Sequence, residues 1–256
     1  VTGVQGTDAI SGVTLTSAGA VSTANVAAYP IVPSNAVFSV GSPSNYTISY
    51  VNGTLTVNPY VVNMTGARAY DGTANVAAGM FTLGPLALGQ TLSLSGSGTI
   101  ADKNVANGKT VNTSGITLVN GTGLASNYTF TGGTQTADIT PAALTATISA
   151  PNKVYDGATT AAPVFTITGG LVGTETVTAT GTATFNSKDV LTANLVTANS
   201  NLLADGLNGG LASNYSLVTG QTVAANITPA ALTATISAPN KIYESGTAPA
   251  RTPATT

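Results

Sequence analysis

The chain of 256 residues contains no histidine, no cysteine and no tryptophan. Histidine and cysteine supply most zinc ligands, the thiolate nucleophiles and the base of the Ser-His-Asp triad, so these kinds of site are excluded. The acidic residues are scattered along the chain, at positions that include Asp71, Asp102, Asp138, Asp156, Glu175, Asp189 and Asp205. The sequence therefore predicts a protein that is not an enzyme and that binds no cofactor and no metal.

Charged side chains are also scarce, because only 6% of the residues are charged and the formal net charge is −2. A typical soluble protein carries about 25% charged residues. Without a basic run to neutralise phosphates, we expect no nucleic-acid partner. The longest apolar stretch, residues 77–89, is interrupted by Gly79, Gly84 and Pro85. It falls short of the roughly 20 residues of a membrane-spanning helix, so we expect no membrane span in this chain.

Small and β-branched side chains are what the sequence has in abundance. The hydrophobic fraction is 43%, whereas disordered chains combine low hydrophobicity with high net charge. The apolar residues are mainly Ala, Val, Leu and Ile, and they are mixed with many Thr residues. Such side chains suit pleated, half-buried strands. The composition predicts a folded, all-β protein with thin cores and a surface of Thr, Ser, Asn and Gly.

The sequence repeats itself, and the repeat is its most informative feature. Residues 139–153 recur unchanged at 227–241, about 88 positions later, which chance does not explain. Three shorter landmarks recur in the same order. They are Tyr70-Asp71-Gly72 with Tyr155-Asp156-Gly157, Lys103-Asn104-Val105 with Lys188-Asp189-Val190, and Asn127-Tyr128 with Asn214-Tyr215 and Asn45-Tyr46. A weaker copy of the first landmark stands at 242–246.

These landmarks divide the chain into pieces of unequal length. Residues 60–141 and 142–229 are complete modules of ordinary domain size. Residues 1–59 look like a module without its first strand, and residues 230–256 look like the opening strand of a truncated further module. We therefore expect the sequence to be cut from a longer tandem array. Because an unpaired sheet edge accepts added strands, a further hypothesis is that one molecule's tail completes another molecule's head.

Within a module, apolar and polar residues alternate with a period of two. Residues 144–150 and 176–184 show this alternation most clearly, which is typical of half-buried strands. The Asn52-Gly53 pair in the middle of residues 48–57 predicts a hairpin, since Asn-Gly accepts the backbone of a type I′ turn. Short strands with turn signals every 8–12 residues favour a small, antiparallel, immunoglobulin-like β-sandwich.

A β-grasp module with a short helix near 74–88 is the alternative fold. In either fold the modules are expected to form a rod, because Thr140-Pro141 and Thr228-Pro229 mark their ends. Proline restricts itself and the preceding residue to extended conformations. A junction of about two residues leaves no slack for one module to fold back on another.

The landmarks together carry a resemblance to a known family. The Asn-Lys-Val-Tyr-Asp-Gly stretch at 152–157, Lys-Asp-Val at 188–190, Ser-Asn-Tyr at 213–215 and Ile-Thr-Pro at 227–229 resemble the YDG repeat of very large secreted bacterial proteins. Residues 44–59 resemble the end of the companion MBG repeat. The resemblance implies an extracellular location at the bacterial cell surface, associated with the outer membrane. It also implies adhesins of the filamentous-haemagglutinin type, which two-partner secretion exports.

The repeated tyrosines are predicted to be structural residues. In Tyr-Asp-Gly, at 70–72 and 155–157, Asp-Gly is expected to form a tight turn while Tyr plugs the end of the sandwich. In Asn-Tyr, at 127–128 and 214–215, the ring is expected to be a core anchor of the tyrosine-corner kind. The alternatives are a recognition loop and a carbohydrate-stacking tyrosine, respectively. An isopeptide bond from Lys153 or Lys188 to an asparagine is a further alternative.

Two functions follow as hypotheses. In the first, neighbouring repeats of the same chain are the partners, and the modules form a stalk that projects a distal binding region for adhesion or biofilm formation. In the second, the modules themselves bind a host or matrix glycan or protein through their loops. The loops are mostly Gly, Ala, Ser and Thr, whereas a binding module is expected to concentrate Tyr, Asn, Asp or Arg there. The loop composition favours the stalk.

Overall fold

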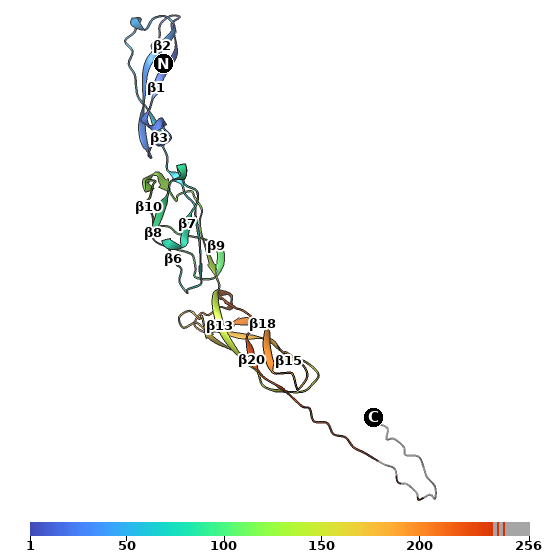
Figure 1. Ribbon diagram of the computed structural model, residues 1–256. Helices are drawn as coiled ribbons and strands as arrows, with labels where there is room; N and C mark the ends of the chain where they lie inside the picture. The colour runs from blue at the N-terminus through green and yellow to red at the C-terminus, as the bar shows by residue number, and fades with distance from the viewer. Residues whose placement is uncertain (238–239, 241–242, 244–256) are drawn as a thin grey trace.

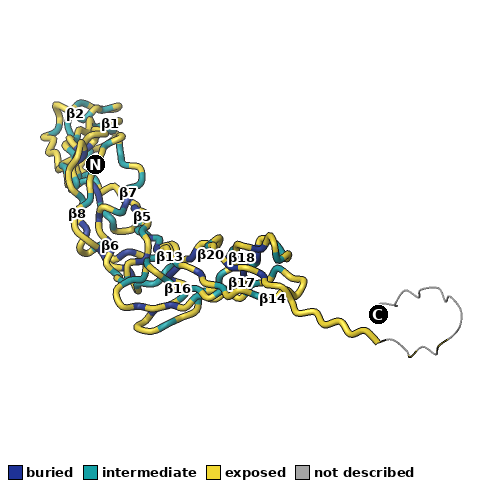
Figure 2. Tube along the Cα trace, turned by 60° about the horizontal axis from the view of Figure 1, so that its bottom comes forward, coloured by how far each residue is buried: buried dark blue, intermediate teal, exposed yellow. Residues whose placement is uncertain are grey.

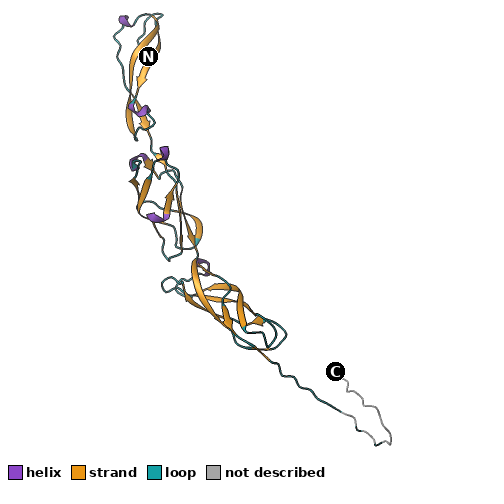
Figure 3. Ribbon diagram, in the orientation of Figure 1, coloured by secondary structure: helices purple, strands orange, loops and turns teal. Residues whose placement is uncertain are grey.

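The computed structural model describes residues 1–237, Asn240 and Tyr243. The rest of the expected opening at 230–256, including all of the weak landmark at 242–246 except its tyrosine, lies outside the described residues. Three small bodies follow one another along a curved rod, with the N-terminus in the first body and residues 230–237 leaving the last (Figure 1). Strands dominate each body, and the helical pieces of the described chain are 3-10 turns of three residues (Figure 3). The all-β prediction is confirmed.

The first module, residues 1–59, is a single antiparallel sheet in the order β1-β2-β3. Its strands are β1 (Ala9–Thr16), β2 (Ala27–Val40) and β3 (Gly53–Val57). All of residues 1–59 are described, and Gly19 is the one buried residue among them. Figure 2 shows the first module as mostly exposed or half-buried. A lone sheet leaves one face without a packing partner, so this module has no closed core.

The second module, residues 60–141, combines two larger sheets with a short strand pair. The sheets have the orders β10-β8-β6 and β7-β5-β12-β9, and the pair is β11-β4. The strands are β4 (Tyr60–Val61), β5 (Met64–Ala69), β6 (Asn75–Ala77), β7 (Phe81–Leu83), β8 (Leu92–Thr99), β9 (Ala106–Thr110), β10 (Ile116–Asn120), β11 (Tyr128–Thr129) and β12 (Gln135–Thr140). Side chains of both sheets share one core, among them Met64, Val76 and Ile139.

The third module, residues 142–229, has the same plan. Its sheets have the orders β16-β13-β19 and β15-β17-β18-β20, and its short pair is β14-β21. The strands are β13 (Ala142–Ser149), β14 (Lys153–Val154), β15 (Thr160–Ala161), β16 (Val164–Gly169), β17 (Val177–Phe185), β18 (Leu195–Asp205), β19 (Tyr215–Leu217), β20 (Thr222–Ala224) and β21 (Ile227–Thr228). The two sheets enclose a core that includes Ile148, Phe185 and Val196, so the sandwich-like architecture agrees with the prediction.

The alternation that predicted the strands is visible in their burial. Along β13, Leu144 is 4% exposed and Ile148 is 7% exposed, while the threonines between them face outward. Strand β17 alternates in the same way from Val177 to Phe185. Several core positions hold only alanine, such as Ala183, so the cores are thin as expected.

Three details differ from the expectations. The hairpin predicted around Asn52-Gly53 does not form, because residues 47–52 are not in a strand and β3 pairs with β2 instead. The helix that a β-grasp module needs is absent from residues 74–88, where two 3-10 turns, Ala78–Met80 and Ala87–Gly89, stand in its place. The sheets are also not purely antiparallel. The opening strand of each complete module pairs in parallel with a closing strand, as β13 does with β19.

The chain passes from one module to the next without a linker. Pro141 is the single residue between β12 and β13, and Asn58 and Pro59 alone separate β3 from β4. Because proline fixes its own φ angle and restricts the residue before it, both crossings are stiff. The short junctions predicted from the sequence are confirmed.

Candidate functional site: the junctions between modules

The three Asn-Tyr motifs occupy the same place in the three modules. Each asparagine ends a 3-10 turn and each tyrosine follows directly, after η2 (Pro43–Asn45), η5 (Ala125–Asn127) and η6 (Ala212–Asn214). In the second and third modules this turn lies at the front end, the end that faces the preceding module. The end that faces the following module is called the rear end below.

At the second junction, between the second and third modules, the amide of Asn214 joins the two modules. Its Oδ1 accepts a hydrogen bond from the backbone N–H of Val105 at 2.9 Å, and its Nδ2 donates to Oδ1 of Asn104 at 3.0 Å. Asn214 has an exposed fraction of 0%, so both bonds are shielded from water. We call this pair of hydrogen bonds the asparagine clasp.

The first junction, between the first and second modules, has the same clasp. Asn127 Oδ1 accepts from the backbone N–H of Val26 at 2.9 Å, and its Nδ2 donates to Oδ1 of Asn25 at 2.9 Å. The rear ends of the first two modules therefore present Asn-Val, and the third module has Asp189-Val190 at the same place. Identical bonds at both junctions set the modules in a common register.

Next to each clasp, a tyrosine is buried in its own module. Tyr128 is 6% exposed and Tyr215 is 4% exposed, so both rings lie in the cores of their modules. The hydroxyl of Tyr215 donates to Oε2 of Glu175 at 2.7 Å and accepts from the backbone N–H of Val172 at 3.1 Å. The hydroxyl of Tyr128 donates to Oε1 of Gln90 at 2.6 Å. Each ring thus fixes the loop that precedes a long strand of its module.

Two further side chains reach the second junction from the rear end of the second module. Tyr70 is 3% exposed, its ring meets that of Tyr215 edge-on with centroids 5.6 Å apart, and its hydroxyl donates to Oε1 of Glu175 at 2.8 Å. Lys103 forms an ion pair with the same Oε1, and its Nζ lies 5.6 Å from the centre of the Tyr70 ring. Glu175 is therefore held by three groups, two of which belong to the preceding module.

The Glu175 carboxylate and the Lys103 amine both remain charged at neutral pH. Burial alone raises the pKa of the Glu175 carboxyl group, but the hydrogen bonds from Lys103, Tyr215 and Tyr70 outweigh burial and hold that pKa below its ordinary value. The hydrogen bond to Glu175, followed by that to Tyr70, raises the pKa of the Lys103 amine. Lys103 is therefore a protonated partner of the Glu175 carboxylate at this junction.

The Tyr-Asp-Gly motif forms the predicted turn in both copies. The carboxylate of the aspartate accepts a hydrogen bond from the backbone N–H two residues later, at 2.9 Å for Asp71 and 3.0 Å for Asp156. The glycines Gly72 and Gly157 have φ angles of 79° and 80°, which side chains other than glycine rarely adopt. The motif is thus a fixed turn at the rear end of its module.

Lys153 stabilises the Tyr-Asp-Gly turn at 155–157. Its Nζ donates to the carbonyl oxygens of Ala158 and Thr160, both at 2.9 Å, and lies 2.8 Å from Oδ1 of Asp156. These oxygen contacts engage the amine within the turn, so they favour a structural role for Lys153 over an isopeptide bond.

The tyrosines of the two turns have different surroundings. Tyr70, at the second junction, is 3% exposed, whereas Tyr155 is 39% exposed. The glycines differ in the same way: a Cβ atom on Gly72 would lie 2.7 Å from Cγ1 of Val172 in the next module, while one on Gly157 would have no neighbour within 4 Å. Tyr70 belongs to one buried cluster with residues of its own module, such as Ile100, and with Tyr215 of the next module, so its ring fills the space between the two modules.

The acceptor of the tyrosine hydroxyl in each Asn-Tyr motif is the feature that the sequence did not reveal. These acceptors stand 38, 38 and 40 residues before their tyrosines, and the pairs are Asp8 with Tyr46, Gln90 with Tyr128 and Glu175 with Tyr215. The near-constant spacing was the available signal. The change among Asp, Gln and Glu hides it from a search for identical residues.

Within the part of the chain that the structure describes, no group of three or more His, Cys, Asp or Glu side chains is placed to hold a metal ion. No helix among these residues has the length and apolar character that crossing a membrane requires.

Comparison with known proteins places the modules in a family. The YDG domain matches residues 52–137 and 140–224, and the MBG domain (YGX type) matches residues 1–56. No curated protein and no solved structure matches the chain. The two YDG matches cover more than half of the sequence and contain both Asn-Tyr motifs with a buried tyrosine. The chain therefore belongs to the YDG domain family, with two tandem YDG domains after an MBG domain.

Proposed function

We propose that this chain is a stalk segment of a bacterial cell-surface adhesin, whose repeated modules hold a distal binding region away from the cell. The observation that carries the proposal is the continuous core at the second junction. One cluster of buried side chains runs from Met64 and Ile139 in the second module to Leu144 and Leu217 in the third. A junction with a shared core resists bending, and a spacer needs stiff junctions to keep its two ends apart.

The way in which modules meet also suits a stalk. Each junction involves only nearest neighbours, so an array of this kind lengthens without a change in its joints. The asparagine clasp repeats at both junctions, and the single residue Pro141 joins β12 to β13. These features fix the direction of the rod at each step.

The domain families of the chain support a location at the cell surface. YDG and MBG domains occur in adhesin-like repeat proteins, so the proposal includes secretion, by the two-partner route, and display at the outer surface of the cell. Labelling of intact cells with an antibody against these modules tests the location. Labelling only after permeabilisation would refute it.

Small-angle scattering tests the stalk shape in solution. A compact globule of 256 residues would have a radius of gyration near about 18 Å. We expect a clearly larger radius and an asymmetric distance distribution, as a rod gives. A compact radius with a symmetric distribution would mean that the modules pack side by side, and the proposal would fail.

A replacement experiment on cells separates spacing from binding. Deletion of these modules from the surface protein that carries them should reduce adhesion, and an unrelated rigid β-sandwich array of equal length should restore it. If only the native modules restore adhesion, they bind the ligand themselves. A glycan array with the purified chain would then identify that ligand class.

A further inference from the structure

The chain enters and leaves the second module along two neighbouring strands. It enters through β4 and β5, and it leaves through β12, which leads to Pro141. β5 and β12 pair in parallel over six consecutive residue pairs, from Met64 with Gln135 to Ala69 with Thr140. β4 pairs in parallel with β11 just before them. Because the strands are parallel, the chain enters at one end of this ladder and leaves at the other.

The third module has the same arrangement. The first three residues of β13 pair in parallel with β19, and β14 pairs in parallel with β21. The backbone N–H of Lys153 donates to the carbonyl oxygen of Asn226 at 3.0 Å, and that of Tyr155 donates to the carbonyl oxygen of Thr228 at 2.8 Å. In both complete modules, therefore, the strands that carry the chain in are bonded directly to strands that carry it out.

This topology decides how the module meets a pull along the rod. Such a pull acts on the entry strand and the exit strand in opposite directions along their axes. The hydrogen bonds between the two strands run across the pull, so all of them are loaded in shear at the same time. Since Pro141 alone separates β12 from β13, the load passes from one module straight into the next.

The ladder of the second module is shielded from water. β5 and β12 are the two inner strands of a sheet in the order β7-β5-β12-β9. Met64, Ala137 and Ile139 on these strands are buried. Groups that separate in such a place lose their partners before water replaces them, which makes partial opening costly.

Further hydrogen bonds secure both ends of the same ladder. At the rear end, the backbone N–H of Tyr70 donates to the carbonyl oxygen of Thr140 at 2.8 Å. At the front end, Nε2 of Gln135 donates to the carbonyl oxygen of Val62 at 3.0 Å. A pull that reaches the ladder from either side meets bonded groups first, so the ladder does not fray from its ends.

We propose that each complete YDG module bears tension along the rod through a shear clamp, the parallel ladder between its entry and exit strands. The clamp consists of β4-β11 with β5-β12 in the second module and of β13-β19 with β14-β21 in the third. This load-bearing role goes beyond the proposed stalk, because a spacer needs stiffness at rest and a clamp resists force. A rod that scatters as expected but yields at low force would refute the clamp alone.

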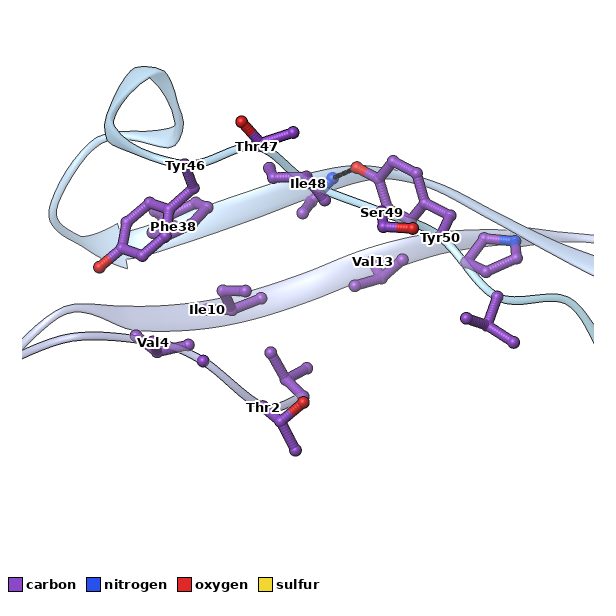
Figure 4. A pocket seen from close by; sticks show the side chains of 15 residues that line it. Thr2, Val4, Ile10, Val13, Phe38, Tyr46, Thr47, Ile48, Ser49 and Tyr50 are labelled. Atoms are coloured by element: carbon purple, nitrogen blue, oxygen red, sulfur yellow. Dashed lines mark hydrogen bonds between the residues drawn. The ribbon is translucent and has the colours of Figure 1, made fainter.

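The two clamps differ in length. The long ladder of the second module has six residue pairs, whereas the ladders of the third module have three and two. We therefore expect the third module to yield first. In the first module, residues 46–48 correspond to β11 and β19 and line an open groove with Ile10 and Phe38 (Figure 4). No strand of the described residues pairs with 46–48, so clamps are assigned to the two complete modules only.

Single-molecule pulling on the purified full chain tests the proposal, with handles on cysteines added at the two ends. The chain has no cysteine of its own, so attachment is specific. We expect two separate high-force events, each of which lengthens the chain by roughly 250 Å as about 80 residues become extended. Modules that extend gradually, without such events, would overturn the proposal.

A change in the direction of pull provides the matched control. Handles on Thr73→Cys and Thr140→Cys, both exposed, pull β5 and β12 apart from the rear end of the second module. The residue pairs are then loaded one after another, so the unfolding force should fall to less than about half of the end-to-end value. Equal forces in the two directions would show that the resistance does not come from the clamp.

A pair of proline variants separates the clamp from overall stability. Thr136→Pro removes a backbone N–H from β12 on the load path, and Thr117→Pro removes one from the edge strand β10 outside it. For the same loss of stability in urea, Thr136→Pro should lower the unfolding force of the second module much more than Thr117→Pro. Equal losses of force would overturn the proposal. The change in pulling direction needs no proline, so it decides the question even if Thr136→Pro prevents folding.

Discussion

The two junctions share the asparagine clasp but differ in the chemistry around it. The first junction is neutral: Ala24 and Gln90 line a pocket of about 320 Å³ together with Tyr60, which is 46% exposed. At the second junction Lys103 pairs with Glu175 and the buried Tyr70 fills the space between the modules. Ala24 and Gln90 at the first junction thus occupy the positions that Lys103 and Glu175 occupy at the second junction.

This difference indicates that the side-chain charges on the two sides of a junction are matched. A carboxylate in place of Gln90 would find no cation opposite it, and Lys103 opposite an amide would lose its counter-charge. A partly buried charge without a partner is costly, whereas a neutral pair or an ion pair is tolerated. The clasp therefore sets the register of the modules, while the side chains beside it distinguish one neighbour from another.

The largest effect is expected at Tyr70. Tyr70→Ala should destabilise the second junction by about 3 kcal/mol, because it removes a buried ring and leaves a cavity between the modules. Tyr155→Ala removes the same ring from the exposed copy of the motif and should cost less than about 1 kcal/mol. Native-state hydrogen exchange at the junction measures both values. Equal losses would show that the ring stabilises its own module and not the junction.

The ion pair is the next feature to break. Glu175→Gln should destabilise the second junction by about 2 kcal/mol, because the hydroxyls of Tyr70 and Tyr215 lose a charged acceptor at a buried position. Lys103, whose side chain is 36% exposed, also loses its counter-charge. The double variant Lys103→Ala/Glu175→Gln reproduces the pair found at the first junction and should recover at least about half of that loss. Hydrogen exchange of residues around the clasp provides the measurement. A double variant that is worse than the single one would contradict the idea of matched pairs.

The clasp can be removed at either junction. Asn214→Ala should cost about 2 kcal/mol and Asn127→Ala about 1 kcal/mol, since each leaves a backbone N–H without its acceptor. The larger value belongs to Asn214 because it is fully buried, whereas Asn127 is half-buried and water can replace its bonds. Spin labels on introduced cysteines across each junction report the result as a broader distance distribution. The chain has no cysteine of its own, so the labelling is specific.

The two junctions should also respond differently to pH. The pKa of Glu175 is lowered in the folded state from 4.5, so its stabilisation is present above that value and is lost as the pH falls through the folded pKa. The pKa of Lys103 is raised from 10.5, so its stabilisation is present below that value and is lost as the pH rises through the folded pKa. Scattering from pH 7 down to pH 3 should show the second junction loosening towards the acid end, with little change at the first junction. At pH 11 the pH is still below the folded pKa of Lys103, so the second junction should hold.

The smallest difference is expected at the two turn glycines. Alanine at Gly72 or Gly157 is strained by the positive φ angle to a similar extent, about 1 kcal/mol. Gly72→Ala should cost about 0.5–1 kcal/mol more, because its Cβ would press on Val172 of the next module. Thermal unfolding followed by circular dichroism compares the two variants. Identical melting curves would remove Gly72 from the junction.

Much of the fold was predictable because strands and turns leave local patterns. The alternation at residues 144–150 predicted β13, and the Asp-Gly pairs predicted the two turns with positive φ. The failed hairpin at Asn52-Gly53 shows the limit of local patterns. In the complete modules the corresponding strands, β19 and β20, belong to different sheets. A turn signal cannot report which sheet a strand joins, because that depends on partners far away in the chain.

The candidate site was predictable in part for the same reason. The repeated Tyr70, Asn127 and Asn214 stood out in the sequence, but as residues of single modules. That the amide of Asn214 reaches Val105, 109 residues earlier, follows only from the placement of two modules. Glu175 seemed to be one of several scattered acids until the structure placed it between Lys103 and two tyrosines.

The identical segments at 142–149 and 230–237 separate what sequence and tertiary structure each decide. The sequence by itself determined the alternation, which makes either segment able to form a strand with Leu and Ile on one face. Only the tertiary structure decided that one segment is the buried strand β13 while the other forms no strand and exposes 95% of Leu232. The physical reason is that a strand satisfies its backbone and buries its face through neighbours that are distant in the chain, and among the described residues those neighbours surround residues 142–149.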